Sequence, residues 1–450
     1  MSTQPARGMR DFLPEDVRRR EYVVGVIRRI YDRYGFEPLE TPAVENIETL
    51  LGAQYGDENS KLIFKILKRG EHEASGQADL ALRYDLTVPL ARVVAEHQSK
   101  LPKFFKRYQI QPVWRADRPA RGRYREFYQC DIDSVGSTSP LVEAEQIAAV
   151  SEILTTLGFD DFVIRLNHRK FIAAWLGRIG IPDARYGEVL VTIDKVDKIG
   201  KDGVAKELGE KGYTDADIAG IVEWIGVHHP PEWIETVAGQ FTDQASSGLD
   251  NLRQIVRLTS NTTAAGKLRI DPSLARGLGY YTGAIMEINV KDMPGSIAGG
   301  GRYDNLIGMF LGTEVPACGF SLGLERLIVV LQERGMFPPD VEQPSIDVVV
   351  AALDDGALNA AMETAPELRR SGHLRVDLYP EIARKMDKVF KHVDQRHAKF
   401  IAILGSDEVA AGTVTIRNVG TRTRETKPLV EAASFVEDAL RDLRDSSRDT

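Results

Sequence analysis

Residues 104–133, FFKRYQIQPVWRADRPARGRYREFYQCDID, carry the clearest structural signal in the chain. Aromatic and apolar residues alternate with charged ones along both arms of this stretch, which predicts an antiparallel pair of strands with one face in solvent. Residues 117–122 contain Pro119, Gly122 and two arginines, so we expect them to form the connecting loop.

The same stretch is strongly basic. From Lys100 to Arg125 there are nine Lys or Arg residues and one acid, Asp117, in a chain whose net charge is −8. Arginines on a sheet face can bind phosphate or carboxylate oxygens, and an aromatic ring such as Phe127 can stack on a base. The basic island therefore predicts a phosphate-bearing ligand. The alternative is a solvated hairpin whose arginines bind nothing specific.

Length and composition are those of an ordinary globular enzyme. The chain has 450 residues, 43% hydrophobic and 28% charged, which suggests two to four domains. No apolar run approaches the roughly 18–20 residues of a membrane span, and the N-terminus resembles neither a signal peptide nor a transit peptide. Cys130 and Cys318 are too few for a disulfide framework or a zinc site, so we expect reduced cysteines in apolar strands of a cytoplasmic protein.

Periodicity and turn residues place further elements around the hairpin. They are a helix from Pro14 to Gly35 followed by a strand from Phe36 to Thr41, a strand that becomes a helix at Thr87, and a helix from about Pro140 to Gly158. From about 167 to 265 lysine and aspartate are frequent, short helices are expected and no chemical motif appears. We interpret this part as a helical insertion within a first domain of residues 1–335.

A second domain is expected at residues 345–450, after a linker rich in proline and acid, Pro338–Pro344. Its strands alternate with helices, which predicts a small α/β domain with a largely buried sheet. A helix predicted from Pro380 to Val393 carries a basic stripe, defined as Arg384, Lys388, Lys391 and the nearby Lys399. This stripe could bind RNA phosphates or could simply be solvated.

The segment Arg276–Gly283, RGLGYYTG, is not a dinucleotide-binding loop. Its third glycine comes one residue late, and the residues that follow look like a strand rather than a helix. Its glycines could let the backbone lie against a ligand that Arg276 and Tyr281 face, or it could be the plain start of a strand.

Two later segments are also rich in glycine. Gly299–Asp304 predicts a tight loop before a helix from Asn305, and it could be no more than a turn. In Pro316–Leu327 a strand is expected to reach Gly323, and Arg326 lies in the first turn of the helix that follows. That position can place an arginine over a nucleotide, although the arginine could equally be solvated.

No Ser-His-Asp, Cys-His or metal-ligand pattern is recognisable, because the histidines are scattered along the sequence. The remaining chemistry relies on arginines and carboxylates. It suits a reaction at phosphorus that depends on positioning and charge stabilisation.

Six segments in order along the chain resemble the histidyl-tRNA synthetases, a family of class II aminoacyl-tRNA synthetases. They are RGMRD (7–11) with the helix and strand that end at Pro42, RYDLT (83–87), Arg115–Gln129, RGLGYY (276–281), GGGRYD (299–304) and GLER (323–326). The terminal domain, with AILG (402–405) and AAGTV (410–414), looks like the family's anticodon-binding domain. The resemblance covers nearly the whole chain and implies an α+β catalytic core on an antiparallel sheet, a helical insertion and a C-terminal α/β anticodon-binding domain.

The resemblance implies that the chain activates histidine with ATP to histidyl-adenylate and transfers histidine to the 3′ end of tRNA(His). It also implies a homodimer, Mg²⁺ that accompanies ATP, and no membrane partner. At the reacting phosphorus the resemblance places Arg115 and Arg276, and around ATP it places Arg115, Arg123, Phe127 and Arg326. The substrate ammonium group is expected to meet Asp85, Thr87 and Gln129, and the two imidazole nitrogens are expected to meet Asp133 and Tyr281, with Tyr303 beside them. Glu325 is a candidate ligand of Mg²⁺.

Three positions depart from the usual family pattern. RYDLT looks like the eukaryotic branch, Gly279 stands where Asp is common, and Asp117 replaces a glutamate. Two related classes remain as alternatives. Non-enzymatic paralogs that regulate ATP phosphoribosyltransferase usually lose catalytic arginines and lack the anticodon-binding domain, whereas this chain has both. Modules that sense uncharged tRNA are usually fused to a kinase, and no kinase signature fits here.

Overall fold

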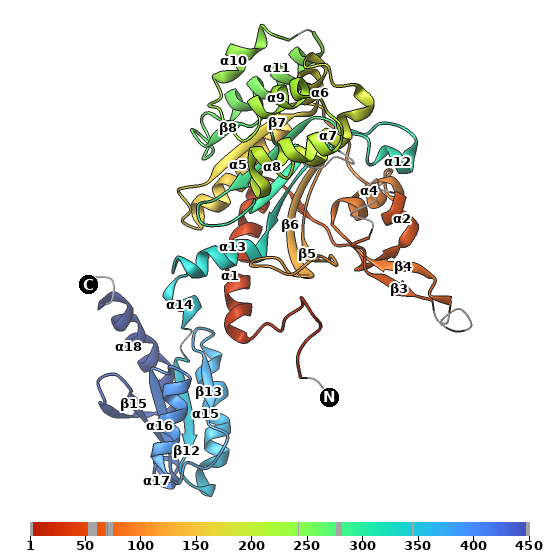
Figure 1. Cartoon of the computed structure of the whole chain (residues 1–450). Helices are drawn as coiled ribbons and strands as arrows, with labels where there is room; N and C mark the ends of the chain where they lie inside the picture. The colour runs from red at the N-terminus through yellow and green to blue at the C-terminus, as the bar shows by residue number, and fades with distance from the viewer. Residues whose placement is uncertain are drawn as a thin grey trace. The chain divides into compact units, whose positions relative to one another are not determined.

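The structure, a computed structural model, describes residues 3–52, 61–68, 70, 75–241, 243–275, 281–343 and 346–446. The chain divides into two compact units, residues 1–336 and 337–450 (Figure 1). Each unit is described by itself.

An eight-stranded sheet forms the centre of the first unit. Only the outer pairs, β1 with β5 and β7 with β8, are parallel, and the other neighbours are antiparallel. This agrees with the expected antiparallel core. In spatial order the strands are β1 (Glu37–Pro38), β5 (Phe105–Trp114), β6 (Glu126–Val135), β11 (Ala317–Gly323), β10 (Ala298–Arg302), β9 (Ala284–Asn289), β7 (Val163–His168) and β8 (Leu268–Ile270).

The predicted hairpin is β5 and β6, which pair from Phe105 opposite Val135 to Trp114 opposite Glu126. The prediction of one solvent-exposed face is wrong for β6, since every residue from Gln129 to Val135 is buried. Polar side chains on this strand bond to one another and to neighbouring strands rather than to water. Alternation alone cannot tell such a strand from one that faces solvent.

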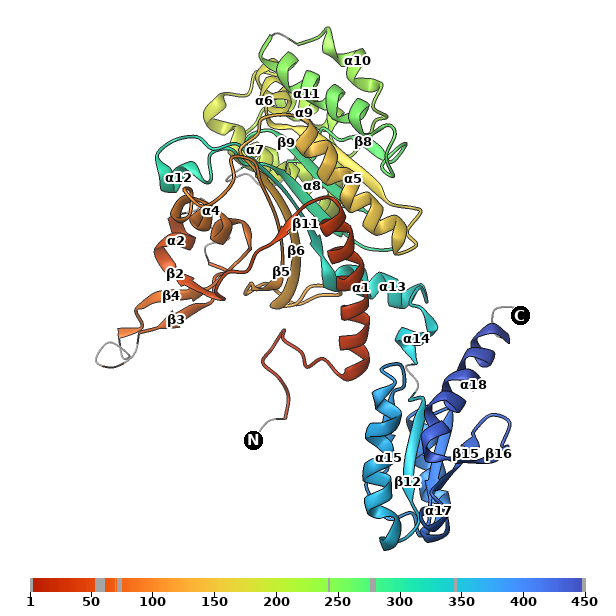
Figure 2. The same cartoon turned by 180° about the vertical axis from the view of Figure 1, so that it is seen from behind.

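Three helices cover one face of this sheet: α1 (Pro14–Arg33), α5 (Leu141–Thr156) and α13 (Leu324–Glu333). Figure 2 shows α1 and α5 in front of the strands. Helix α1 begins with Pro14 at its first position and with acids in its first turn, both of which favour a helix start. Its buried residues include Val23, Ile27 and Ile30, which are spaced by three or four and so form one apolar stripe.

A small three-stranded sheet lies between α1 and the hairpin in sequence. It contains β2 (Val44–Asn46), β4 (Ala78–Leu82) and β3 (Lys65–Leu67), with α2 (Ile47–Gly52) and α4 (Thr87–Glu96) nearby. Helix α4 starts at Thr87, as predicted from the sequence.

The helical insertion connects β7 to β8 and is coloured green in Figure 1. It contains α6 (Arg169–Arg178), the 3-10 turn η2 (Asp183–Arg185), α7 (Tyr186–Ile193), α8 (Val196–Glu210), α9 (Asp215–Trp224), α10 (Trp233–Ala238) and α11 (Asp243–Thr259). Trp175, Val204 and Ile221 are buried in one apolar cluster that also includes Ile285 of β9. One of its helices, α11, is longer than the short ones expected and has 17 residues, whereas α8 is interrupted by a kink at Gly200.

Gly299–Asp304 corrects another prediction. Residues Ala298–Arg302 form strand β10, not a tight loop, and the next helix is α12 (Gly308–Leu311). A Cβ on Gly300 would lie 2.2 Å from Gly319 O, and one on Gly301 would lie 2.6 Å from Ala284 O. These glycines are therefore required by close packing against neighbouring strands, which a local sequence pattern does not report.

The second unit is built on a five-stranded sheet with helices on both faces. In spatial order the strands are β13 (Val376–Leu378), β12 (Val348–Ala352), β14 (Phe400–Leu404), β15 (Thr413–Asn418) and β16 (Arg424–Pro428). Helices α15 (Leu358–Arg370) and α18 (Ala432–Ser446) pack on one face and α16 (Met386–Gln395) on the other. The remaining elements are α14 (Pro339–Glu342), η3 (Asp355–Ala357), α17 (Ser406–Ala411) and η4 (Leu429–Glu431).

Two boundaries in this unit differ from prediction. Part of the expected linker, Pro339–Glu342, forms the short helix α14. Helix α16 starts at Met386 rather than Pro380. The residues before it are held in another way, because Ala383 N donates to Ala352 O of β12 at 2.7 Å instead of continuing a helix.

Candidate functional site

One face of β6 presents several of the residues expected at the site. Side chains alternate between faces along a strand, so Phe127, Gln129 and Asp133 point the same way. Ser134 points to the helix-covered face, where Gln146 Nε2 of α5 lies 3.5 Å from its hydroxyl. The expected site face is therefore the one opposite α1, α5 and α13.

Arg115 lies at the open end of this face, just after β5. Its Nε donates to Tyr84 O at 3.0 Å and its Nη2 donates to Gln129 Oε1 at 3.3 Å. The guanidinium stacks over the rings of Tyr84 and Phe127, 4.3 and 5.1 Å from their centroids. Two hydrogen bonds and two rings fix the plane of the group. An arginine held in this way presents its remaining N–H groups in a defined direction.

A buried ion pair lies deeper on the same face. Arg107 of β5 stands directly opposite Asp133, and its Nη2 lies 2.8 Å from Asp133 Oδ2. The Tyr303 hydroxyl donates to the other carboxylate oxygen, Oδ1. Burial raises the pKa of Asp133, and Arg107 and Tyr303 oppose that rise. Gly319 leaves room for the carboxylate, since a Cβ there would come within 2.0 Å of Asp133 Oδ1.

Asp85 and Thr87 lie at the start of α4. Asp85 is buried, and its Oδ1 accepts a hydrogen bond from Val88 N at 3.0 Å. Thr87 is the first residue of the helix and is partly exposed. Arg107 Nη2 also donates to Leu86 O at 3.2 Å, so this segment is tied to the sheet beside Asp133.

Of the two expected residues in RGLGYY, Arg276 lies outside the described residues, as does Gly279. Tyr281 is partly buried and packs against apolar residues on the α4 side and in the helical insertion. Its ring lies against Gly301 of β10, where a Cβ would come within 3.1 Å of Tyr281 Cδ1. The ring thus reaches the same sheet as Tyr303.

Arg123 and Arg326, two of the residues expected around ATP, both lie beside the loop that connects β5 and β6. Arg123 is exposed, and its Nε lies 3.2 Å from Asp117 Oδ2. Gly122 has a positive φ of 65°, and a Cβ there would lie 3.2 Å from Arg326 Cγ. The loop therefore approaches Arg326, whose Nη1 also donates to Ser296 O.

Glu325 has a different position from the one expected of a metal ligand. It is buried, and both carboxylate oxygens accept from Tyr128 N at 3.1 Å, which ties α13 to β6. Burial raises its pKa to about 7. Within the described residues, no group of three or more His, Cys, Asp or Glu side chains is arranged to hold a metal ion.

Arg107, Asp131 and Ser321 were not among the residues expected at the site. All three face the site residues, and Ser321 of β11 stands directly opposite Asp131. The two-residue alternation from Gln129 to Asp133 was a signal for Asp131. Arg107 and Ser321 could be found only through strand register, which the sequence does not report.

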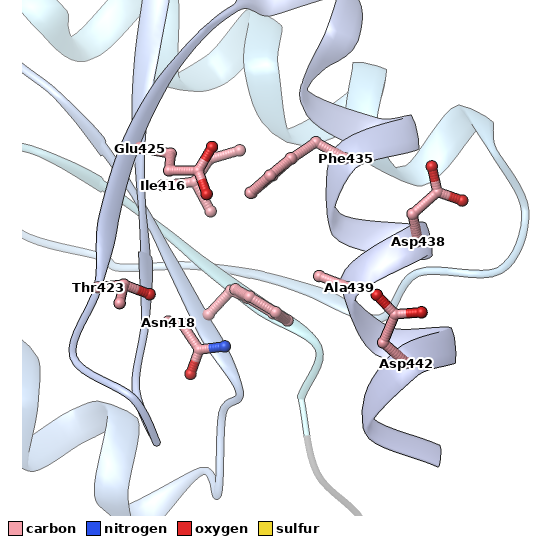
Figure 3. Close-up of a pocket in the computed structure, with 9 residues that line it drawn as sticks. Ile416, Asn418, Thr423, Glu425, Phe435, Asp438, Ala439 and Asp442 are labelled. Carbon is pink, nitrogen blue, oxygen red and sulfur yellow. The ribbon is translucent and has the colours of Figure 1, made fainter. Parts of the chain in front are cut away.

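Basic residues on one side of the second unit and an acidic hollow on the other stand out among its charged groups. The stripe residues Arg384, Lys388 and Lys391 are exposed on and just before α16, and Lys399 is partly exposed. On the α18 side there is a hollow of about 300 Å³ with three carboxylates, Glu425, Asp438 and Asp442. Figure 3 shows β15 and β16 residues facing Phe435 and Ala439 of α18 across this hollow.

Both cysteines, Cys130 and Cys318, are free and buried in β6 and β11, as predicted. In the parts of the chain that the structure describes, no helix is both long and apolar enough to span a bilayer.

Comparison with known proteins identifies the family. Residues 8–327 match the family model described as histidyl-tRNA synthetase, and residues 347–439 match the anticodon binding domain. The histidine–tRNA ligase of Gloeobacter violaceus is 38% identical over 461 residues, which cover 96% of this chain and 98% of the relative. That of Leifsonia xyli subsp. xyli is 44% identical over 354 residues, which cover 75% and 82%.

Solved structures agree. The crystal structure of histidyl-tRNA synthetase from Nostoc sp. PCC 7120 has a TM-score of 0.79 at 30% identity and covers 98% of this chain and 100% of that one. A Bacillus halodurans protein described as an ATP phosphoribosyltransferase regulatory subunit/histidyl-tRNA synthetase has a TM-score of 0.74 at 20% identity, which shows the fold alone. The chain therefore belongs to the histidyl-tRNA synthetase family and has its class II catalytic unit followed by an anticodon-binding domain.

Proposed function

We propose that this protein is a histidine–tRNA ligase, which activates histidine with ATP and transfers it to the 3′ end of tRNA(His). The observation that carries the proposal is the match of both units, residues 8–327 to the synthetase model and 347–439 to the anticodon-binding model. A regulatory paralog would need only the first unit.

In this proposal the amino acid lies over β6. Asp85, Thr87 and Gln129 hold its ammonium group, and Asp133 and Tyr281 bond to the two imidazole nitrogens. Tyr303 supports this because it donates to Asp133 and so fixes the carboxylate. A site with buried groups for both ring nitrogens rejects analogues that leave those groups unpaired.

The first step is an attack by the histidine carboxylate on the α-phosphorus of ATP. A bond forms from carboxylate oxygen to phosphorus, and the bond to pyrophosphate breaks. The nucleophile is already ionised at pH 7, so the protein supplies position and positive charge rather than a base. Arg115 and Arg276 provide that charge. The support for Arg115 is its fixed plane next to Gln129, from which it reaches both carboxylate and phosphate.

ATP is proposed to lie with adenine between Phe127 and Arg326 and with its outer phosphates near Arg123. Arg123 now pairs with Asp117 in an exposed contact, which costs little to exchange for a phosphate. Mg²⁺ that enters with ATP would be held mainly by phosphate oxygens and water. Glu325 does not fit as its ligand, because the carboxylate is buried and already bonded to Tyr128 N.

For tRNA we propose two contacts. The hairpin loop, Arg118–Arg123, meets the acceptor end, and the basic stripe meets phosphates of the anticodon arm. The three carboxylates at the hollow on the α18 side support the stripe, on the other face, as the RNA side.

We propose that the protein acts as a homodimer in the cytoplasm. Exposed apolar side chains on the small sheet support a dimer interface, because water disfavours them. They are Val44, Leu67 and Leu80, which are 38% to 54% exposed. Sedimentation of the purified protein at micromolar concentration tests the dimer directly.

The test of the function is ATP–pyrophosphate exchange without tRNA, with each amino acid supplied separately. Exchange that depends on histidine alone, followed by charging of tRNA(His), is the expected result. Histidine binding without exchange would contradict the proposal and favour the regulatory or sensor class.

A further inference from the structure

Asp131 is a buried carboxylate on the site face to which the proposed reaction gives no part. It lies on β6 between Gln129 and Asp133, so its side chain points to the same face as theirs. Strand register places it opposite Gln109 of β5 and Ser321 of β11. It is 3% exposed, so it lies beneath the site rather than in solvent.

Asp131 determines how the Gln129 amide is turned. Gln129 Nε2 donates to Ser321 Oγ at 3.0 Å and lies 3.3 and 3.5 Å from the two Asp131 oxygens. Gln129 Oε1 points the other way and accepts from Arg115 Nη2 at 3.3 Å. An amide flip would bring Oε1 against the ionised Asp131 carboxylate, an acceptor against an acceptor. Asp131 and Ser321 therefore keep the amide oxygen on the Arg115 side.

The charges around Asp131 favour a positively charged ligand on the site face of β6. Asp133 on the same strand and Asp85 at the start of α4 both act to raise its pKa, whereas Arg107 on β5 and a hydrogen bond from Ser321 lower it. Arg107 is ion-paired with Asp133 and also favours the charged form of Asp131. Burial is the largest influence and raises the pKa of Asp131 to about 7. A bound ammonium group would lower the cost of holding this negative charge.

We propose that Asp131 is a positioning residue for the amino-acid substrate: it fixes Gln129 so that the amide oxygen, and not the amide N–H₂, faces the α-ammonium group. This inference rests on the proposed function. Its chemical basis is that an ammonium group has three donors and no acceptor, so it can bond only to the oxygen end of the amide.

The test compares Asp131→Ala, Asp131→Asn and the wild type by the KM values of ATP–pyrophosphate exchange. Asp131→Ala is expected to raise KM for histidine about 10- to 100-fold, the effect of losing a hydrogen bond to a charged group, and to change KM for ATP little. Asp131→Asn keeps an oxygen acceptor of the same size and is expected to lie between the two. It also keeps the test open if the alanine variant does not fold.

Ser134→Ala is the matched control. Ser134 is a buried polar residue of the same strand but points to the helix-covered face, so KM for histidine should stay at the wild-type value. Equal rises in KM for histidine and for ATP in the Asp131 variants would indicate general damage to the sheet and overturn the proposal.

A double-mutant cycle with Gln129→Ala decides whether Asp131 acts through Gln129. If it does, Asp131→Ala adds little in the Gln129→Ala background, because the group it positions is gone. Additive losses would overturn the positioning role. Absence of histidine-dependent exchange in the wild type would instead contradict the proposed function, so the two failures are distinguishable.

Discussion

Strand β6 of the first unit and strands β12 and β14 of the second are all buried, but with opposite chemistry. β12 reads VVVAA and β14 reads FIAIL, and apolar clusters cover both of their faces. β6 has helices over one face, while the other presents Gln129, Asp131 and Asp133. The strands are alike in being buried, but the polar side chains of β6 need hydrogen-bond or ion-pair partners and the apolar side chains of β12 and β14 do not.

The difference shows how a buried surface becomes a binding site. Apolar side chains stabilise the fold simply by leaving water, at about 25 cal/mol per Å². Buried carboxylates destabilise it unless each finds a partner. Asp131 and Asp133 are both buried on β6, and Arg107 is ion-paired with Asp133, so a positively charged ligand would be favoured beside Asp131. The second unit gains stability from its buried strands, and the first gives up some stability for recognition.

The largest expected effect comes from Arg115→Ala. Loss of a preorganised charge at the reacting phosphorus should reduce ATP–pyrophosphate exchange about 10³-fold, while the thermal midpoint changes little because Arg115 is partly exposed. Arg370→Ala removes an exposed arginine of α15 and should leave exchange unchanged. Similar exchange rates in the two variants would remove Arg115 from the mechanism.

The resemblance of RGLGYY to the family's motif leads us to expect that Arg276→Ala abolishes adenylate formation and leaves the fold intact.

Arg107→Leu tests the polar side of the comparison through stability. It leaves Asp133 and Asp131 buried without their cation and should lower the free energy of unfolding of the first unit by about 3–5 kcal/mol. Urea denaturation measures it. Adding Asp133→Asn should restore part of the loss, because one uncompensated charge is removed. No recovery in the double variant would show that the cost is one of packing rather than of charge.

Leu404→Ala tests the apolar side. Leu404 of β14 is fully buried, and its truncation should destabilise the second unit by about 2–5 kcal/mol. Exchange without tRNA should persist at temperatures where tRNA charging is already lost, and activity measured against temperature would reveal this. If both activities fail together, stability of the first unit depends on the second.

The basic stripe gives a smaller effect, confined to tRNA. Lys388→Glu with Lys391→Glu should raise KM for tRNA several-fold and reduce its dependence on salt, since fewer phosphate contacts release fewer counterions. KM for histidine and ATP should stay the same. Replacing Asp438 and Asp442, on the acidic face, with Asn serves as the control and should not weaken tRNA binding.

The smallest expected effect concerns pH and Asp131. The pKa of this acid is about 7 in the folded protein against an ordinary 3.8, so the folded state binds the proton more tightly than the unfolded state. The stability that the protonated Asp131 side chain contributes to the folded state is therefore lost as pH rises from about 4 to about 7. Asp131→Asn should raise the thermal midpoint by a few degrees at pH 8 and change it little near pH 4. An equal shift at both pH values would contradict this account.

Much of the fold could be predicted from local pattern. The hairpin, α1 and the start of α4 at Thr87 follow directly from periodicity and from helix-start residues. Predictions failed where neighbours distant in sequence decide the structure. The glycines of β10 are strand residues because β9 and β11 pass too close for a side chain. The residues before α16 bond to β12, so the helix starts late.

The candidate site shows the same limit. The motif residues Arg115, Gln129 and Asp133 could be named from sequence, and their roles in the reaction stay predictions. Arg107 could not be named, because nothing near it in sequence shows that it stands opposite Asp133. Asp131 could have been named from alternation, but its hold on Gln129 depends on Ser321, which is 190 residues away (321 − 131).

The sequence by itself determined the family, the two-unit organisation, the basic island and most of the local elements. Only the tertiary structure decided that β6 is buried from Gln129 to Val135, that Asp133 is ion-paired with Arg107, and which end of the Gln129 amide faces Arg115. The physical reason is that periodicity reports how a residue relates to its own strand or helix. Strand register brings together side chains that are far apart in the chain, and burial then turns their charges into a site.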